Sequence, residues 1–174
     1  MRSCLPRGQG IEGEMRKESP EKKEEKQILI FTLASEELGL DISCVREVLR
    51  PQKTYPLPRT PLFIEGVIDL RGYIIALIDL RNRLIGKPME KEPNQRIIVC
   101  RIHNFVVGLT VNSLKEIITL SKDDIMPTPE VVAMQMEAEV ISGIARVGER
   151  IVPILDLEHI LTRKEVAELS ALKQ

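Results

Sequence analysis

The sequence predicts a mainly β protein made of two small five-stranded barrels that arose from one duplicated unit. Three observations lead to this fold class. Short apolar runs rich in Ile, Val and Leu are separated by Gly and Pro, which is typical of strands and turns. The same series of runs occurs twice along the chain. Each series holds about five short strands with local pairing, and closing them into a barrel removes exposed sheet edges.

The duplication is visible as two matched blocks of sequence. Gly39 matches Gly108, 69 positions later, so that LGLDISCVREVL lies over VGLTVNSLKEII. Gly66 matches Gly143, 77 positions later, so that GVIDLRGYIIALIDL lies over GIARVGERIVPILDL. Because the second offset exceeds the first, the loop between the two blocks is longer in the second copy. Each copy therefore carries the same strands in the same order.

The first copy begins at Gln27 and alternates apolar runs with turn signals. The segment 44–50 fits a helix or a strand, and the flanking strands favour a strand. Four prolines from Pro51 to Pro61 remove backbone donors, which predicts an extended loop. The remaining elements are expected as strands at 28–34 and 38–42, a hairpin over 66–81 and a short helix that ends at Gly86.

The second copy repeats this order. Its strands are expected at 96–102, 105–111, 114–120, 140–148 and 150–157, with a proline-bearing loop before the fourth. Near the C-terminus Val166, Leu169 and Leu172 recur at helical spacing, which predicts an amphipathic helix over 164–174.

The domain organisation follows from composition and from the repeat. Residues 1–26 are mostly charged or polar, and such a segment buries too little apolar surface to fold, so we expect it to be disordered. Residues 27–163 form the folded domain, with barrel one at about 27–90 and barrel two at about 91–163. Each unit of about 65–75 residues is marginal alone, so we expect the two to share a core.

Charge and composition narrow the classes of function. The chain has 25 basic and 26 acidic residues, no Trp and 3% aromatic residues, which argues against nucleic-acid binding. No apolar run approaches the roughly 18 residues of a membrane span, and the N-terminus lacks the apolar stretch of a signal peptide. Three widely spaced cysteines are expected to be reduced thiols in a cytoplasmic protein.

Catalytic and metal-binding constellations find no support in the sequence. Asp79 and Asp156 each end an apolar strand, as in two-lobed aspartic proteases, but each is followed by Leu rather than by a small hydroxyl residue. We interpret them as strand ends that cap the turn or helix after them. The only two histidines, His103 and His159, and the cysteines lack metal-ligand spacing, so no metal and no cofactor are expected.

The most informative single residue is Arg71, just before Gly72 in the hairpin. A partly buried guanidinium needs a partner, and Glu47 on the alternating segment of the same copy is a candidate. The alternative that Arg71 is an ordinary exposed arginine at a strand end stays open. The stretch 69–72 is specific to the first copy, because the second copy has Arg-Val-Gly-Glu there.

At these residues the chain resembles the CheW-like domain family. GVIDLRGYIIALIDLR is similar to the family signature Gly-Val-x-Asn-Leu-Arg-Gly-x-Ile-x-Pro-Val-x-Asp-Leu-Arg, and FTLASEELGLDISCVREVLR is similar to the family's opening. The resemblance extends from about Gln27 to Leu161. Asp69 stands where Asn is usual, Ala76 where Pro is usual and Asn112 where Asp is frequent.

The resemblance implies a fold, a role and a set of contact residues. It implies two interlocked five-stranded SH3-like barrels, with no enzymatic activity and no cofactor. It implies an adaptor that couples the cytoplasmic tips of methyl-accepting chemoreceptors to the regulatory domain of the histidine kinase CheA. Such a protein is cytoplasmic and is recruited to receptor arrays without inserting into the membrane. The partner-binding positions carried over are Val45, Glu47, Gly66, Arg71, Gly72, Leu114 and Ile117, of which Leu114 and Ile117 are expected on the barrel-two side of a groove between the barrels.

Two alternative functions remain at this stage. The same adaptor could serve another chemosensory-type pathway, such as twitching motility or second-messenger control. A small barrel could also bind nucleic acid or a small ligand, although the composition gives this reading no support.

Overall fold

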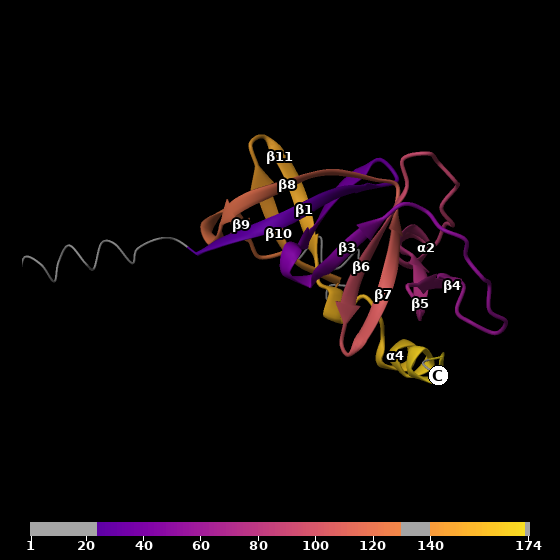
Figure 1. Cartoon of the computed structure of the whole chain (residues 1–174). Coiled ribbons are helices and arrows are strands. Elements are labelled where there is room, and N and C mark those ends of the chain that lie inside the picture. Colours follow the sequence, from indigo (N-terminus) through magenta and orange to yellow (C-terminus); the bar gives the residue numbers. More distant parts are fainter. Residues whose placement is uncertain (1–23, 130–139, 173–174) are drawn as a thin grey trace, which may run out of the picture.

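The structure, a computed structural model, describes residues 24–129 and 140–172. It confirms the mainly β fold class, and Figure 1 shows two groups of strands joined side by side. The strands are β1 (Glu25–Leu33), β2 (Glu36–Asp41), β3 (Val45–Leu49), β4 (Ile64–Leu70), β5 (Tyr73–Asp79), β6 (Arg96–Ile102), β7 (Phe105–Val111), β8 (Ser113–Ser121), β9 (Ile125–Met126), β10 (Ile141–Val147) and β11 (Arg150–Leu155). The helical elements are α2 (Leu80–Ile85), α4 (Arg163–Leu172) and the short 3-10 turns η2 (Ile42–Cys44), η3 (Lys122–Asp124) and η5 (Leu157–His159).

The strands form two sheets that correspond to the two barrels. Barrel one has the strand order β3-β6-β7-β5-β4, and barrel two has the order β8-β1-β2-β11-β10-β9. In Figure 1 barrel two occupies the upper left of the molecule, and barrel one lies to its right. The chain thus builds two barrels of similar construction.

Each barrel is closed by one chain segment that bends and pairs with two different strands, one before the bend and one after it. In barrel one the segment after β3 runs to Tyr55, which exchanges two backbone hydrogen bonds of 2.8 and 2.9 Å with Val67 of β4. In barrel two β8 pairs with β1, and after the single turn η3 the same path continues as β9 and pairs with β10. The six strands of barrel two therefore correspond to five chain segments.

The two barrels exchange hairpins between the halves of the sequence. Hairpin β1–β2 lies in barrel two, and hairpin β6–β7 lies in barrel one. The expected contiguous division at 27–90 and 91–163 therefore does not hold for these hairpins. The register of a hairpin is local, whereas the barrel that it joins is set by long-range parallel pairing, which the local sequence pattern does not contain.

The exchange is symmetric and follows the sequence repeat. Across the parallel join of β5 and β7, Leu77 pairs with Gly108, and across the join of β11 and β2, Ile154 pairs with Gly39. These are matched positions of the repeat. A Cβ atom built on Gly39 would lie 2.7 Å from an isoleucine side chain, and one built on Gly108 would lie 2.8 Å from another. Both joins therefore require glycine because a neighbouring side chain occupies the space.

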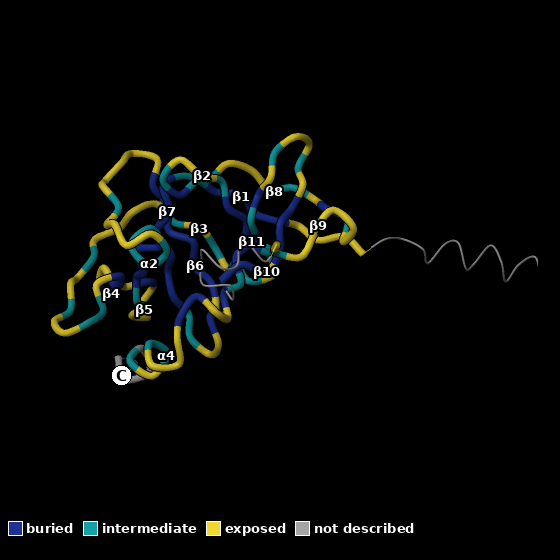
Figure 2. The backbone as a smooth tube through the Cα atoms, turned by 180° about the vertical axis from the view of Figure 1, so that it is seen from behind, coloured by how far each residue is buried: buried dark blue, intermediate teal, exposed yellow. Residues whose placement is uncertain are grey.

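The buried apolar residues of the described part of the chain form three clusters, one inside each barrel and one shared between them. The shared cluster confirms the expected common core, and Figure 2 shows the buried backbone concentrated where the barrels meet. Its fully or nearly fully buried members from both barrels include Leu29, Phe31, Leu40, Ile98, Cys100 and Leu109. The interiors of the barrels are built from matched positions of the repeat, such as Ile28 with Ile97 and Ile75 with Val152.

The two ends of the chain agree in part with the sequence predictions. Residues 1–23 lie outside the described part, and β1 begins at Glu25, within the segment 1–26 for which disorder was predicted. Glu25 is ordered because β8 extends to Ser121 and pairs with it. The predicted C-terminal helix is present as α4, where Val166 packs against the shared core.

The helix caps also agree with the sequence. Asp79 accepts a hydrogen bond from the backbone N–H of Asn82 at 3.0 Å, and Asp156 accepts one from Glu158 at 3.0 Å. Gly86 ends α2 with a left-handed φ of 85°. Both aspartates therefore act as caps, as predicted.

We expect the substitution Gly66→Ala to lower the free energy of unfolding by about 3 kcal/mol. A Cβ there would lie 2.3 Å from the carbonyl oxygen of Tyr55, which is backbone and cannot move without opening the barrel-one closure. Gly148→Ala is the matched control: its φ is 63°, no atom lies within 4 Å of its Cβ position, and its cost is about 1 kcal/mol. Urea unfolding measures both, and equal losses would contradict the role of Gly66 in closure.

Candidate functional site

A cleft of about 490 Å³ opens at the mouth of barrel one. Its wall is mainly apolar and comes from hairpins of both sequence halves, with Tyr73 and Ile74 from β5 and Phe105 and Val106 from β7. Tyr73 is 76% exposed, which is unusual for a large aromatic residue. An apolar hollow with an exposed aromatic side chain at its edge is typical of a docking site for another protein.

Arg71 stands at the rim of this cleft in a strained turn. Its φ of 52° is followed by a φ of 90° at Gly72, and two positive values in succession are typical of a type I′ hairpin turn. The turn is held by the carboxylate of Asp69, which accepts a hydrogen bond of 2.8 Å from the N–H of Gly72. A non-glycine residue with positive φ costs roughly 1 kcal/mol or more, so the turn gives up stability to place Arg71 here.

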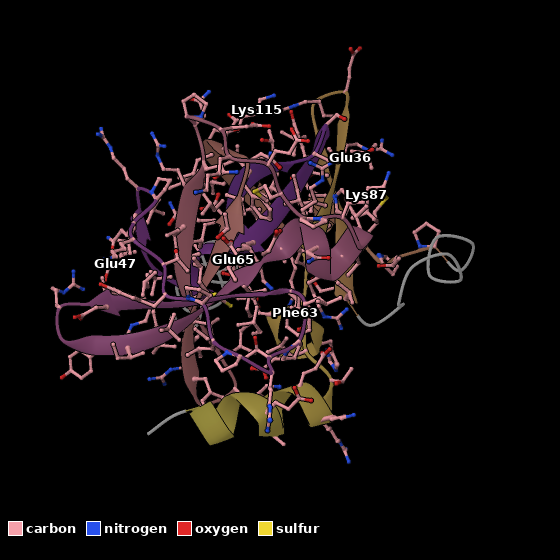
Figure 3. The ribbon with its side chains drawn as sticks, turned by 90° about the vertical axis from the view of Figure 1, so that its right-hand side faces the viewer. Glu36, Glu47, Phe63, Glu65, Lys87 and Lys115 are labelled. Carbon is pink, nitrogen blue, oxygen red and sulfur yellow. The ribbon has the colours of Figure 1, made fainter. Side chains whose placement is uncertain are left out.

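The predicted partnership of Arg71 with Glu47 is present in the structure. The guanidinium forms two contacts with the carboxylate, Nη2–Oε2 at 2.5 Å and Nη1–Oε1 at 3.3 Å. The Arg71 side chain is 69% exposed, and exposed ion pairs contribute little to stability. Its two-point geometry instead fixes the direction of both side chains at the rim. Figure 3 shows Glu47 close to the tip of the β4–β5 hairpin.

The ion pair changes the protonation equilibrium of Glu47. The hydrogen bonds from Arg71 hold the pKa of the Glu47 carboxyl below its ordinary value, against the opposing effect of desolvation. The same pair raises the pKa of Arg71. Both groups are therefore charged at neutral pH, and the rim presents a fixed pair of opposite charges.

The other predicted site residues of barrel one have distinct surroundings. Val45 begins β3 and packs against the shared core, so only part of it is exposed. Gly72 is exposed in the turn. Gly66 is buried beneath Tyr55, so its small size serves the closure of the barrel.

Leu114 and Ile117 lie on β8 of barrel two and do not line the cleft. Leu114 packs partly against the shared core. Ile117 is 56% exposed. The structure therefore does not bring these two residues together with Arg71, because β8 belongs to the other barrel.

Sequence reasoning missed the apolar wall of the cleft. Phe105 and Val106 come from the second half of the sequence and reach barrel one only through the hairpin exchange. It also missed a second ion pair, in which Arg150 Nη2 lies 2.8 Å from Glu116 Oε2. The sequence repeat aligns Glu116 with Glu47. Because Glu47 was expected to pair with an arginine, the same expectation for Glu116 could have predicted this second ion pair.

The histidines and cysteines do not assemble a metal site among the described residues. His103 contacts the side chain of Glu158, and His159 contacts Asp156, so each has a local carboxylate partner. Burial raises the pKa of the Cys100 thiol to about 12, and burial also raises the pKa of Cys44. Both described cysteines are free thiols, consistent with the sequence expectation.

Comparison with known proteins identifies the family. The model of the CheW-like domain matches residues 27–165, which is most of the chain. The chain belongs to the CheW-like family. Its residues at the unusual signature positions are accommodated: Asp69 bonds to the turn, and the Asn112 side-chain oxygen accepts a hydrogen bond of 2.7 Å from the N–H of Ala34.

Individual relatives agree with this family. The chemotaxis protein CheW of Klebsiella aerogenes is 35% identical over 141 residues, which cover 81% of this chain and 84% of that protein. A probable chemotaxis protein CheW of Rhizobium etli is 30% identical over 141 residues, covering 81% and 90%. The crystal structure of the scaffolding protein TtCheW from Thermoanaerobacter tengcongensis is 34% identical, with a TM-score of 0.75 over 82% of this chain and 96% of that one.

These comparisons bear on the fold and the general role. The similarity to the solved CheW structure supports the SH3-like barrel architecture, and the relatives are chemotaxis and scaffolding proteins. Among the described residues, no helix is long and apolar enough to cross a membrane.

We expect the side-chain carboxyl of Glu47 to titrate below the ordinary glutamate pKa of about 4.3, and to return towards that value in Arg71→Ala. Because the folded pKa is lowered, the stability from this pair is present above the unfolded pKa and is lost as the pH falls through the folded pKa. Carbon-detected NMR titration measures the midpoint. Glu37, whose pKa is lowered mainly by Lys115, is the internal control and is expected not to change. An unchanged Glu47 midpoint in the variant would show that Arg71 does not cause the shift.

Proposed function

We propose that this chain is a non-enzymatic adaptor that couples the cytoplasmic tips of chemoreceptors to the histidine kinase CheA. The observation that carries the proposal is the apolar cleft of barrel one with the Arg71–Glu47 pair at its rim. Membership of a family whose relatives are chemotaxis and scaffolding proteins supports the same role.

The cleft fits the apolar stripe of a helical hairpin. A chemoreceptor tip is an amphipathic helical hairpin, and helices of this kind bind by laying their apolar face into a hydrophobic groove. Tyr73 and Ile74 are both more than half exposed, and covering them would remove apolar surface from water. Large aromatic residues of this kind frequently supply much of the binding energy in such interfaces.

The charged pair at the rim of the cleft sets the orientation in which the partner docks. Arg71 is held by Glu47 but keeps most of its side chain exposed, so its remaining N–H groups can donate to carbonyl or carboxylate oxygens of the partner. A pre-oriented arginine loses less conformational entropy on binding than a free one. The pair therefore orients the receptor tip over the apolar cleft.

The kinase regulatory domain requires a further surface on the same adaptor. Exposed residues of β3 and β8 are available, and Ile117 is the more exposed of the two proposed contact residues on barrel two. The shared core fixes barrel one relative to barrel two, so a partner on one barrel is held in a defined position relative to a partner on the other. Such rigidity is what a coupling protein needs.

Each contact is expected to be modest in area and reversible. Interfaces of about 600–800 Å² per partner bind weakly alone, and many of them in an array act through multivalency. We propose that the chain is held at membrane receptors in this way, by protein contacts rather than by insertion into the bilayer.

The substitution Arg71→Ala is expected to abolish most receptor control of kinase activity and to leave the fold intact, because Arg71 is exposed. The measurement is kinase autophosphorylation in a reconstituted mixture of receptor, kinase and adaptor, with and without attractant. Lys122→Ala is the matched control, because it removes another exposed ion pair, Lys122 with Glu24 at 3.3 Å, in the turn η3 that follows β8. Receptor control that is equal in Arg71→Ala and wild type would refute the role given to Arg71.

A further inference from the structure

The ends of the two barrels share a strand register but differ in chemistry. Some residues face each other across neighbouring strands at the mouth of barrel one. Their counterparts in the sequence repeat, at offsets of 77 or 69 positions, pair in the same register in barrel two. Leu70 pairs with Tyr73 as Val147 pairs with Arg150. The two mouths can therefore be compared position by position.

Two matched positions change from apolar to charged. Tyr73 in barrel one corresponds to Arg150 in barrel two, 77 positions later, and Val106 corresponds to Glu37, 69 positions earlier. Tyr73 and Val106 line the cleft. At the barrel-two mouth the same two places are taken by a guanidinium and a carboxylate.

These two residues form the centre of an ion network. Arg150 lies 2.9 Å from Glu37 through Nη1 and 2.8 Å from Glu116 through Nη2, and Glu37 also bonds to Lys115. The network joins three strands, β2, β8 and β11. In Figure 3 Lys115 and Glu36 lie near the top of the view, away from Glu47. The barrel-two mouth is therefore bridged by charges where the barrel-one mouth is apolar.

The glutamate common to both mouths shows where the two mouths differ. Glu47 and Glu116 occupy the same repeat position, and each is paired with an arginine. In barrel one the arginine is in the hairpin turn, at Arg71, which leaves the next strand free to carry Tyr73. In barrel two the turn position is Gly148, and the arginine stands on the strand at Arg150.

We propose that Glu37 and Arg150 are specificity determinants that prevent the barrel-two mouth from accepting the apolar partner of the barrel-one cleft. The proposal rests on the function proposed above, in which that partner is the chemoreceptor tip. It assigns one receptor tip to each adaptor.

The physical reason is the desolvation of the network. An apolar side chain placed on this mouth would remove water from Glu37, Glu116 and Arg150 without supplying hydrogen bonds in return. Charged groups covered in this way disfavour a partner even where the strand register is the same. The barrel-one cleft has no such penalty on its apolar wall.

The test is a reciprocal exchange of the two matched positions in the full chain. Glu37→Val with Arg150→Tyr gives the barrel-two mouth the residues of barrel one, and Val106→Glu with Tyr73→Arg does the reverse. Binding of a soluble chemoreceptor cytoplasmic fragment is measured by titration calorimetry and by sedimentation. The first double variant is expected to bind twice as much fragment per chain as wild type. The second is expected to lose affinity by at least about tenfold.

A matched control and a folding check accompany these variants. Glu24→Val with Lys122→Tyr introduces the same residue types at another exposed ion pair of barrel two and is expected to keep the wild-type stoichiometry. Circular dichroism and thermal unfolding establish whether each variant folds. If the first double variant does not fold, the test rests on the reverse exchange. A folded Val106→Glu, Tyr73→Arg chain that binds the fragment with wild-type affinity overturns the proposal.

The outcomes separate this proposal from the function on which it rests. A wild-type chain that binds no receptor fragment overturns the proposed function and this inference with it. A wild-type chain that binds one fragment, together with a folded Glu37→Val, Arg150→Tyr chain that also binds only one, overturns the inference alone. Doubled stoichiometry in that variant, with the control unchanged, supports both.

Discussion

The parallel pairing between the two halves of the chain is the constraint on which the rest of the structure depends. It joins β5 to β7 and β11 to β2, and it thereby places one hairpin of each half in the barrel of the other half. Neither half can then close its barrel alone. The apolar faces of the exchanged hairpins meet in the shared core, which neither half could bury by itself at its size. The rigid relation between the barrels and the composition of the cleft wall are both consequences of this one exchange.

The exchange also explains which parts of the fold could be predicted from the sequence. The strands, the duplicated order and the caps at Asp79 and Asp156 follow from local pattern, and all of them are present. The prediction that each barrel comes from one continuous half of the sequence was wrong, because a hairpin has the same internal register whichever barrel it joins. The matched glycines Gly39 and Gly108 do mark the joins, but only because neighbouring side chains fill their Cβ positions, which a sequence pattern does not state.

The residues of the candidate site also divide into those that the local sequence predicts and those that it does not. The pairing of Arg71 with Glu47 was predictable because both residues lie in the first half and an arginine in a turn needs a partner. The cleft beside the pair was not, because Phe105 and Val106 arrive from the second half. Gly66 illustrates the reverse case: a position that the family signature suggested for partner binding is buried, and its small size serves the close approach of the Tyr55 backbone.

A duplicated scaffold needs a way to make its two ends different without disturbing their common fold. Here the residues inside the barrels are kept at matched positions as Ile, Val, Leu or Ala, whereas the mouths diverge in charge. The glutamate at the matched position is kept in both copies, and what changes is where its arginine stands: in the turn at Arg71 or on the strand at Arg150. Because exposed ion pairs add little to stability, moving one costs the fold little, yet it decides whether the mouth beside it is apolar or charged. Surface charge is therefore the property in which the two copies could diverge while strand register and core packing stayed the same.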